Sequence, residues 1–183
     1  MKKILTFILV TSMMLSCLSF PALAETVTIE YWIDNDTSDT TNCFNIREGY
    51  TAYIKDSGYY NGDLRRTYSS SQDCYSWVRK NSFGNRVKNS AIYMVVGVYL
   101  KSNVLSDTAA RYWCMQNDGA YYMFSMNQAT NANGWSYQYY TLKTNYQISG
   151  WYSIKGIEVM TSQTGSGYSA ADAIYVFAST PAG

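Results

Sequence analysis

The sequence predicts an all-β protein, an antiparallel β-sandwich. Three observations predict this class. Short segments with apolar side chains at alternate positions recur along the chain, and turns rich in Gly, Asn and Ser separate them. No stretch shows a convincing apolar stripe of the 3.6-residue helical period. Many short strands at regular spacing favour a sandwich.

The predicted strands follow from this alternation. In 26–33 (TVTIEYWI), Tyr31 and Ile33 share one face with the preceding apolar residues. The segment 91–100 (AIYMVVGVYL) is nearly all apolar, which is typical of a central strand. The full set of predicted strands is 26–33, 50–55, 74–80, 91–100, 109–115, 120–127, 135–142, 151–160 and 173–178.

The chain begins with the features of a secretion signal. Two lysines precede an apolar run, and Ala22-Leu23-Ala24 has the small residues of a signal peptidase site. We therefore expect a signal peptide over 1–24 and a single β-sandwich domain over 25–183 that is secreted or displayed on the cell surface. A membrane-spanning segment fits less well because the run is short. A lipid-attachment site at Cys17 also fits its motif less well.

Composition limits the classes of partner. The chain has 14 basic residues, two of them in the signal segment, so 12 remain against 13 acidic ones. This balance gives no basic surface for nucleic acid or for an anionic membrane. We expect no nucleic-acid partner and no membrane insertion after the signal is removed.

Aromatic residues are unusually frequent, with 19 Tyr and 5 Trp, all of them after residue 24. Tyr suits the half-buried surface of a strand, so most of these rings are expected to serve the sheets. So many phenol hydroxyls are nevertheless hard to satisfy in an interior. Several rings should therefore reach the surface.

The sequence contains no histidine. This removes the Ser-His-Asp and Cys-His arrangements and the His-containing zinc centres. Paired carboxylates remain as a route to glycoside hydrolysis. Most acidic residues, however, lie in turn-rich segments, where Asp bends and caps the backbone. We expect a protein that is not an enzyme and holds no catalytic metal.

Three cysteines follow the signal segment: Cys43, Cys74 and Cys114. One disulfide, with one thiol left over, is compatible with an exported chain. The spacing does not choose among the three pairings.

Oxygen-bearing side chains concentrate in IDNDTSD at 33–39, which includes Asp34, Asp36 and Asp39. Hard oxygen ligands at alternate positions suit calcium. The first and last strands of a sandwich often neighbour each other, and Asp172 immediately precedes the last one. A structural calcium between Asp34 and Asp172 is one interpretation. The preferred one is that these aspartates cap turns, and we expect no cofactor.

A candidate ligand site comes from rings that lie beside polar side chains. Sugar rings pack their C–H faces on aromatic rings, while amide, carboxylate and guanidinium groups bond their hydroxyls; small-ligand sites generally combine such groups. The predicted ring platforms are Tyr59, Tyr60 and Trp135, and the predicted polar partners are Asp63, Arg65, Asn127 and Gln128. The alternative is that Trp135 belongs to the core and the Asn-rich segment is only a loop.

Five segments carry a resemblance to a known family. They are IDND at 33–36, GYTAYIKDSGYYNGDLR at 49–65, IYMVVGVYL at 92–100, MNQATNANGW at 126–135 and ADAIYVF at 171–177. In order and spacing the chain resembles the golvesin / xanthan-lyase carbohydrate-binding-like domain family. Two departures are Tyr175, where the family has Arg, and the absence of the Gly that usually follows the Trp.

The resemblance implies a β-sandwich of jelly-roll (galactose-binding-like) type with a non-catalytic role in a secreted bacterial protein, and polysaccharide binding as the family's suggested activity. We therefore expect a module that recognises a polysaccharide or cell-surface glycan without altering it. The alternative is a structural or adhesive extracellular protein that binds a protein partner, because exposed Tyr also suits protein interfaces.

Overall fold

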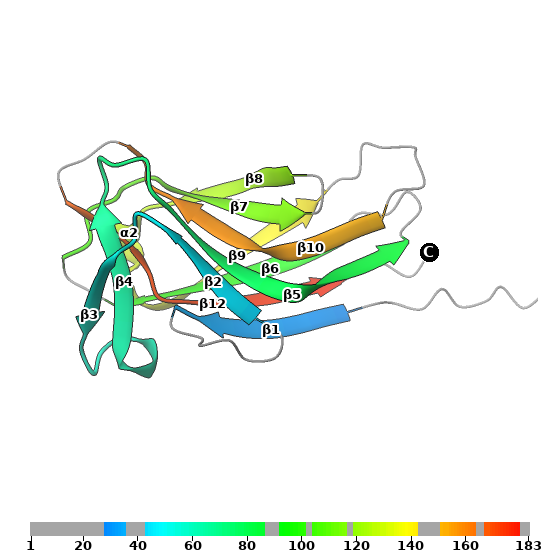
Figure 1. Ribbon diagram of the computed structural model, residues 1–183, viewed down its shortest axis with the longest axis horizontal. Helices are drawn as coiled ribbons and strands as arrows, with labels where there is room; N and C mark the ends of the chain where they lie inside the picture. The colour runs from blue at the N-terminus through cyan, green and yellow to red at the C-terminus, as the bar shows by residue number, and fades with distance from the viewer. Residues whose placement is uncertain are drawn as a thin grey trace, which may run out of the picture.

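Two antiparallel sheets face each other in the computed structural model, and a small third sheet lies at one end of them (Figure 1). The structure describes residues 28–35, 43–86, 92–101, 104–116, 119–142, 151–163 and 167–179. The predicted fold class is confirmed. The signal segment 1–24, Cys17, Asp36 and Asp39 lie outside the described residues. Within the described ranges, no helix has the length and apolar character that a membrane crossing requires.

The first sheet has four strands in the order β1-β12-β6-β9. These strands are β1 (Thr28–Asp34), β12 (Ala173–Ser179), β6 (Ile92–Lys101) and β9 (Asn133–Leu142). The first and last strands of the described chain are direct neighbours, with Thr28 opposite Ser179 and Asp34 opposite Ala173. The expectation that the first and last strands are neighbours is therefore confirmed for the described residues.

The second sheet has five strands in the order β2-β5-β10-β7-β8. These strands are β2 (Cys43–Glu48), β5 (Cys74–Arg86), β10 (Trp151–Met160), β7 (Ala110–Gln116) and β8 (Gly119–Met126). The register of β10 against β5 shifts between Ile154 and Gly156. At this irregularity a Cβ on Gly156 would lie 2.1 Å from the carbonyl oxygen of Trp77, so the two backbones approach too closely for any side chain.

The core fills the space between the two large sheets. Alternate residues of β6 and β12, including Val96, Val98 and Ile174, are buried against Trp77 and Tyr112 of the second sheet. The alternation that predicted the strands thus also placed their inner faces correctly. The indole N–H of Trp77 donates to the carbonyl oxygen of Asp172 at 3.2 Å, which satisfies the polar edge of this buried ring.

A small sheet in the order β11-β4-β3 covers one end of the sandwich (Figure 1). Its strands are β11 (Tyr168–Ala171), β4 (Asp63–Tyr68) and β3 (Ala52–Lys55). A 3-10 turn, η1 (Tyr60–Gly62), joins β3 to β4, and a one-turn helix, α2 (Gln128–Asn131), precedes β9. The sequence did not predict β2, β4, β11 or α2.

Cys74 and Cys114 carry free thiols. Each of the three pairings that the sequence left open includes at least one of these two residues. The structure therefore forms none of them, and the expected disulfide is corrected to two reduced cysteines; the side chain of Cys43 lies outside the described part. Burial raises the pKa of the Cys114 thiol to about 12. At Cys74, burial together with the nearby carboxylates of Glu158 and Glu48 raises the pKa to about 12.

Candidate functional site

The outer face of the four-stranded sheet carries a row of residues in register across all four strands. Trp32 of β1 lies opposite Tyr175 of β12. Tyr175 lies opposite Gly97 of β6, and Gly97 lies opposite Tyr137 of β9. Directly opposed residues point to the same face of a sheet. Trp32 is 54% exposed and Tyr137 is 50% exposed, so the row is open to solvent.

The rings of this face form one continuous strip. The ring centroids of Trp32 and Tyr175 are 4.9 Å apart, and those of Tyr175 and Tyr137 are 6.2 Å apart. Trp135 follows at 6.1 Å from Tyr137, with the two ring planes only 19° apart. Tyr99 lies 5.4 Å from Trp135. We call the following six rings the aromatic strip: Trp32, Tyr175, Tyr137, Trp135, Tyr99 and Tyr60.

Gly97 is the reason that two of these rings can lie down on the sheet. A Cβ at this position would meet Cε1 of Tyr137 at 2.8 Å and Cε3 of Trp135 at 3.2 Å. The two side chains therefore lean from β9 across the neighbouring strand, into the space that a larger residue would occupy. Glycine in the interior of a strand weakens that strand, and it often marks a place where another group approaches closely.

The η1 turn holds Tyr60 at one end of the strip. The Tyr60 ring lies 5.4 Å from Tyr99 and 5.6 Å from Trp135, edge-on to both. The backbone amide of Tyr60 donates to Oδ2 of Asp172 at 3.1 Å. The side-chain amide of Asn61 donates to Oδ2 of Asp34 at 2.7 Å. Asn61 has a positive φ of 50°, which Asn tolerates better than most residues. The turn is thus fixed to β1 and to the segment before β12.

Polar groups border the strip. The hydroxyl of Tyr175 donates to the carboxylate of Glu30 at 3.0 Å. Tyr139 is 83% exposed and extends the aromatic surface along β9. Glu30 lies one outward-facing position from Trp32 along β1, so a carboxylate stands beside the rings.

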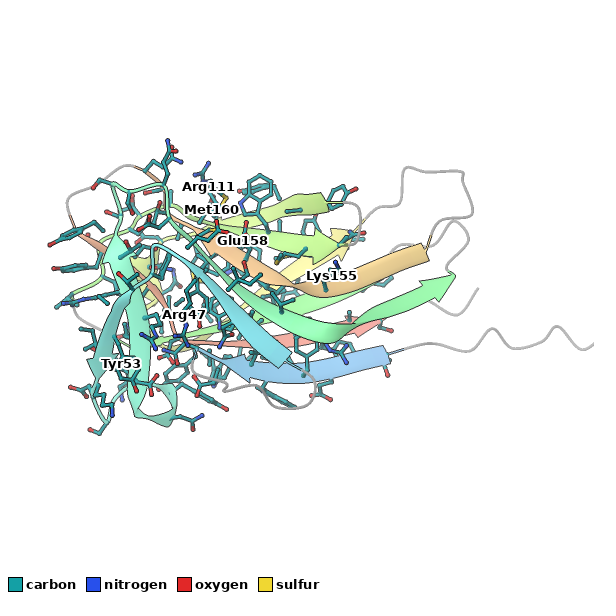
Figure 2. The ribbon with its side chains drawn as sticks, in the orientation of Figure 1. Arg47, Tyr53, Arg111, Lys155, Glu158 and Met160 are labelled. Carbon is teal, nitrogen blue, oxygen red and sulfur yellow. The ribbon has the colours of Figure 1, made fainter. Side chains whose placement is uncertain are left out.

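The opposite outer face, on the five-stranded sheet, has a different character (Figure 2). Arg111 and Glu158 are labelled there, where charges mix with rings such as Trp113 and Tyr122. The carboxylate of Glu158 accepts from the Ser76 hydroxyl at 3.0 Å, and Arg111 donates to the carbonyl oxygen of Thr161 at 2.9 Å. Among the described residues of this face, the rings of Trp113 and Tyr122 make a pair, with centroids 5.5 Å apart. A long strip is therefore a feature of the four-stranded sheet.

The structure brings together two of the predicted ring platforms, Tyr60 and Trp135, in direct contact. Tyr59 points elsewhere: it is half-buried and packs against the core. The predicted partners Asp63 and Arg65 meet on the small sheet, around the exposed ring of Tyr53 (Figure 2). The Tyr53 hydroxyl donates to Asp63 at 3.1 Å, and the Arg65 guanidinium lies 4.3 Å from the ring centre.

The two predicted amide partners serve the fold. Asn127 caps α2, because its side-chain oxygen accepts from the backbone amide of Thr130. Gln128 is fully buried, and its amide nitrogen donates to the carbonyl oxygen of Ala170 and to the Tyr112 hydroxyl. Its oxygen accepts from the Ala170 amide. Gln128 has no exposed surface with which to contact a ligand, so it is not part of the candidate site.

Four members of the strip were missed by the sequence analysis: Trp32, Tyr99, Tyr137 and Tyr175. Trp32, Tyr99 and Tyr175 each alternate with buried neighbours along their strands, so alternation does place them on an outer face. Tyr137 alternates with the polar residues Ser136 and Gln138, a pattern that does not indicate an outer face. Which strands stand side by side is a tertiary property that alternation does not reveal. The local cue of rings beside an Asn-Gly turn found only the end of the strip at Tyr60 and Trp135.

Asp34, Asp63 and Asp172 gather around the η1 turn. Asp172 is fully buried. Burial is the main reason that its pKa rises to about 8; the carboxylates of Asp34 and Asp63 add to the rise, and the hydrogen bond from Tyr60 opposes it. In the part of the chain that the structure describes, no three His, Cys, Asp or Glu side chains form a group suited to a metal ion. A calcium ion between Asp34 and Asp172 stays an untested alternative to the preferred interpretation that these aspartates cap turns.

No protein-family model matches the chain, and no curated protein does. Among solved structures, a family 35 carbohydrate-binding module from Clostridium thermocellum has a TM-score of 0.38 and 16% identity, over 78% of this chain and 100% of the module. A family 29 module from Piromyces equi has a TM-score of 0.32 and 15% identity, over 76% and 91% of the two chains.

An exo-β-1,3-galactanase from Phanerochaete chrysosporium, solved with β-1,3-galactotriose, has a TM-score of 0.40 and 10% identity, over 74% of this chain. This chain spans 28% of the galactanase. The chain resembles the galactanase and the two modules in fold alone.

Proposed function

We propose that the protein binds a polysaccharide or cell-envelope glycan through the aromatic strip, outside the cell, and leaves the bonds of the glycan intact. One observation carries this proposal: aromatic rings in contact with one another cross all four strands of one sheet on its solvent face. A contiguous exposed patch of large apolar side chains on a monomer marks an interaction site.

The chemistry of the strip suits sugar rings. A pyranose has one face of C–H groups that packs on an aromatic ring and a rim of hydroxyls that needs hydrogen bonds. Here rings such as Trp32 and Tyr137 offer the apolar surface, and the carboxylate of Glu30 stands at its border. The strip crosses four strands, which are each separated by about 4.8 Å. A chain of several linked sugars therefore matches its length better than a single sugar does.

The charge of this face supports a partner that is not strongly charged. The outward residues of the strip are uncharged rings. The carboxylates of Glu30 and Asp34 lie beside β12, and Lys101 lies at the far end of β6. Strongly anionic partners require a clustered positive surface, which these positions do not provide.

We also propose that the chain belongs to the golvesin / xanthan-lyase carbohydrate-binding-like family. Tyr175, the position at which the sequence departs from the family's Arg, lies between Trp32 and Tyr137 in the strip. If the family relationship holds, this chain has a ring where its relatives have a cation, and it recognises its glycan mainly by stacking.

A retention assay on insoluble polysaccharides tests the proposal. Purified protein is incubated with cellulose, chitin, xylan, β-1,3-glucan and peptidoglycan sacculi, and the bound fraction is measured. We expect at least one of these to retain the parent. Trp32→Ala and Tyr137→Ala should each weaken this retention by roughly tenfold or more, as expected for loss of a well-packed ring at an interface.

Tyr68→Ala is the matched control. Tyr68 is also exposed, at 61%, and stacks on one neighbouring ring, Tyr168, at 4.9 Å, but it lies on the small sheet. It should bind like the parent. The proposal fails if no glycan retains the parent, or if the strip variants behave like Tyr68→Ala. Tight binding of a purified surface protein in place of any glycan would establish the adhesive alternative.

A further inference from the structure

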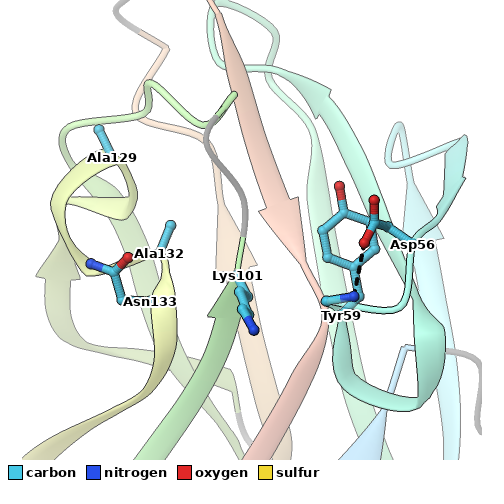
Figure 3. A pocket seen from close by; sticks show the side chains of 7 residues that line it. Asp56, Tyr59, Lys101, Ala129, Ala132 and Asn133 are labelled. Atoms are coloured by element: carbon cyan, nitrogen blue, oxygen red, sulfur yellow. Dashed lines mark hydrogen bonds between the residues drawn. The ribbon is translucent and has the colours of Figure 1, made fainter.

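A cleft opens at the end of the sandwich, beyond the Tyr60 end of the strip (Figure 3). Its volume is about 520 Å³, within the size range of small-molecule sites. Asp56 and Tyr59 form one side, Ala129 and Asn133 form the other, and Lys101 stands between them. None of these residues belongs to the aromatic strip, so the cleft is a second feature of the same end of the molecule.

The polar groups of this cleft can form further hydrogen bonds. One oxygen of Asp56 accepts from the backbone amide of Gly58 at 2.8 Å, which leaves the other oxygen open. Within the described ranges, the ammonium of Lys101, the amide of Asn133 and the hydroxyl of Tyr59 have no hydrogen bond or ion pair. The cleft therefore combines an acceptor, a cationic donor and two groups that both donate and accept.

The charges of Asp56 and Lys101 offset each other. An anion would gain from Lys101 but would face Asp56, and a cation would meet the reverse arrangement. A neutral molecule with several adjacent hydroxyls satisfies both groups, because each hydroxyl donates one hydrogen bond and accepts others. Ala129 and the ring of Tyr59 add apolar surface for the C–H groups of such a molecule.

The cleft and the strip are structurally continuous. Lys101 lies opposite Asn133 in the pairing of β6 and β9, and the pair Tyr99 and Trp135 follows two positions along. The hydroxyl of Tyr99 donates to the carbonyl oxygen of Gly58 at 3.2 Å, so a strip residue is bonded directly to the wall of the cleft. A molecule that leaves the strip at this end meets the cleft next.

We propose that this cleft binds one neutral pyranose residue of the glycan, held between Asp56, Lys101 and Asn133. The inference rests on the proposed function and deepens it, since it divides the recognition surface into a stacking strip and a hydrogen-bonding cleft. It also names the class of sugar that the cleft takes: uncharged and rich in neighbouring hydroxyls.

Nuclear magnetic resonance titration of the isotopically labelled protein tests this inference. The probes are the methyl pyranosides of D-glucose, D-galactose, D-mannose and D-xylose, with D-glucuronate and D-glucosamine as charged counterparts. We expect at least one neutral pyranoside to shift the backbone amide signals of Gly58, Lys101 and Asn133. Asn133→Ala should weaken this binding about tenfold, the effect of losing one well-made hydrogen bond.

Two charge variants sharpen the test. Asp56→Asn keeps the shape and the bond to the Gly58 amide but leaves Lys101 unopposed, so it should shift the preference toward D-glucuronate. Lys101→Met keeps the apolar stem and should shift the preference toward D-glucosamine. Tyr68→Ala, on the small sheet, should leave all of these titrations unchanged.

The inference is overturned if no neutral pyranoside moves the cleft amides, or if D-glucuronate or D-glucosamine binds the parent cleft more tightly than every neutral probe. Failure of the proposed function looks different. In that case no insoluble polysaccharide retains the parent, or the Trp32 and Tyr137 variants are retained like the parent, whatever the cleft does. Loss of retention in those variants, together with a silent cleft, upholds the proposed function and removes only this inference.

Discussion

The backbone amide of Tyr60 donates a hydrogen bond of 3.1 Å to Oδ2 of Asp172, and this bond ties the η1 turn to the start of β12. The second carboxylate oxygen, Oδ1, is buried and has no partner among the described residues. A buried carboxylate oxygen without a hydrogen-bond partner destabilises the charged form of the group, so the protonated form is favoured. This explains the direction in which the pKa of Asp172 moves, to about 8.

We expect the stability of the protein to fall between about pH 4, the usual pKa of an unfolded Asp, and about pH 8. Because the folded pKa is raised, the contribution of Asp172 is fully present below the unfolded value and is lost as the pH rises through the folded one. Asp172→Asn mimics the protonated form and should lack this decline. Denaturant midpoints of both proteins at pH 5, 7 and 9 check it; a parent that gains stability over the variant as pH rises contradicts it.

Gly97→Ala should weaken glycan retention while leaving every ring in the sequence. The added Cβ occupies the space 2.8 Å from the Tyr137 ring and forces the ring ends away from the sheet. These ring ends are at the surface and have room to move, so the free energy of unfolding should change by less than about 1 kcal/mol.

A double-mutant cycle checks the physical reason. In a Tyr137→Ala background the clash with that ring is gone, so the further effect of Gly97→Ala on retention should shrink markedly. Equal effects of Gly97→Ala in both backgrounds would mean that Gly97 does not act through Tyr137.

Gln128→Met should destabilise the fold by roughly 2–4 kcal/mol, because it removes an amide that satisfies buried groups on two segments. The Ala170 amide, which donates to it at 2.8 Å, and the Tyr112 hydroxyl would both lose a partner in the interior. Chemical denaturation measures the loss. At a temperature where the variant is folded, polysaccharide retention should equal that of the parent, and a selective loss of retention would instead return Gln128 to the binding site.

Thiol labelling should find two reduced cysteines of unequal reactivity. The pKa of both is about 12, so little thiolate exists at neutral pH. Cys74 is partly exposed and should react slowly with a disulfide reagent, whereas Cys114 is buried and should react only after unfolding. Mass spectrometry of the labelled peptides separates the two, and a bond between either residue and Cys43 under non-reducing conditions would contradict the structure.

Strands with a strong apolar period were predictable from the sequence, and strands without one were not. The predicted 151–160 coincides with β10, and 91–100 lies within one residue of β6. By contrast, β2 (CFNIRE) is short, with only Phe44 and Ile46 alternating with polar residues, and β4 (DLRRTY) has charged residues at three of its six positions. They form because a neighbouring strand supplies backbone partners, which is a tertiary effect that overrides local preference.

The candidate site divides along the same line. Tyr60 and Trp135 were predictable because each lies beside an Asn-Gly turn that is visible locally. The contact of Trp32 with Tyr175 joins residues that are 143 positions apart in the chain, and it exists because β1 pairs with β12. Burial of Gln128 depends in the same way on the distant segment at Ala170. The polar side chain of Gln128 suggested a ligand contact at the surface, but the packing of the fold places it in the interior.

The adjacency of β1 and β12 has one last consequence. The ring surface joins β1 to β12, whose residues Trp32 and Tyr175 lie 143 positions apart in the sequence, so it cannot exist until these two distant strands have paired. Such distant pairings form late and slowly. The protein would then bind a glycan only after β1 and β12 have paired, so retention on a polysaccharide column would also test whether the protein has refolded correctly.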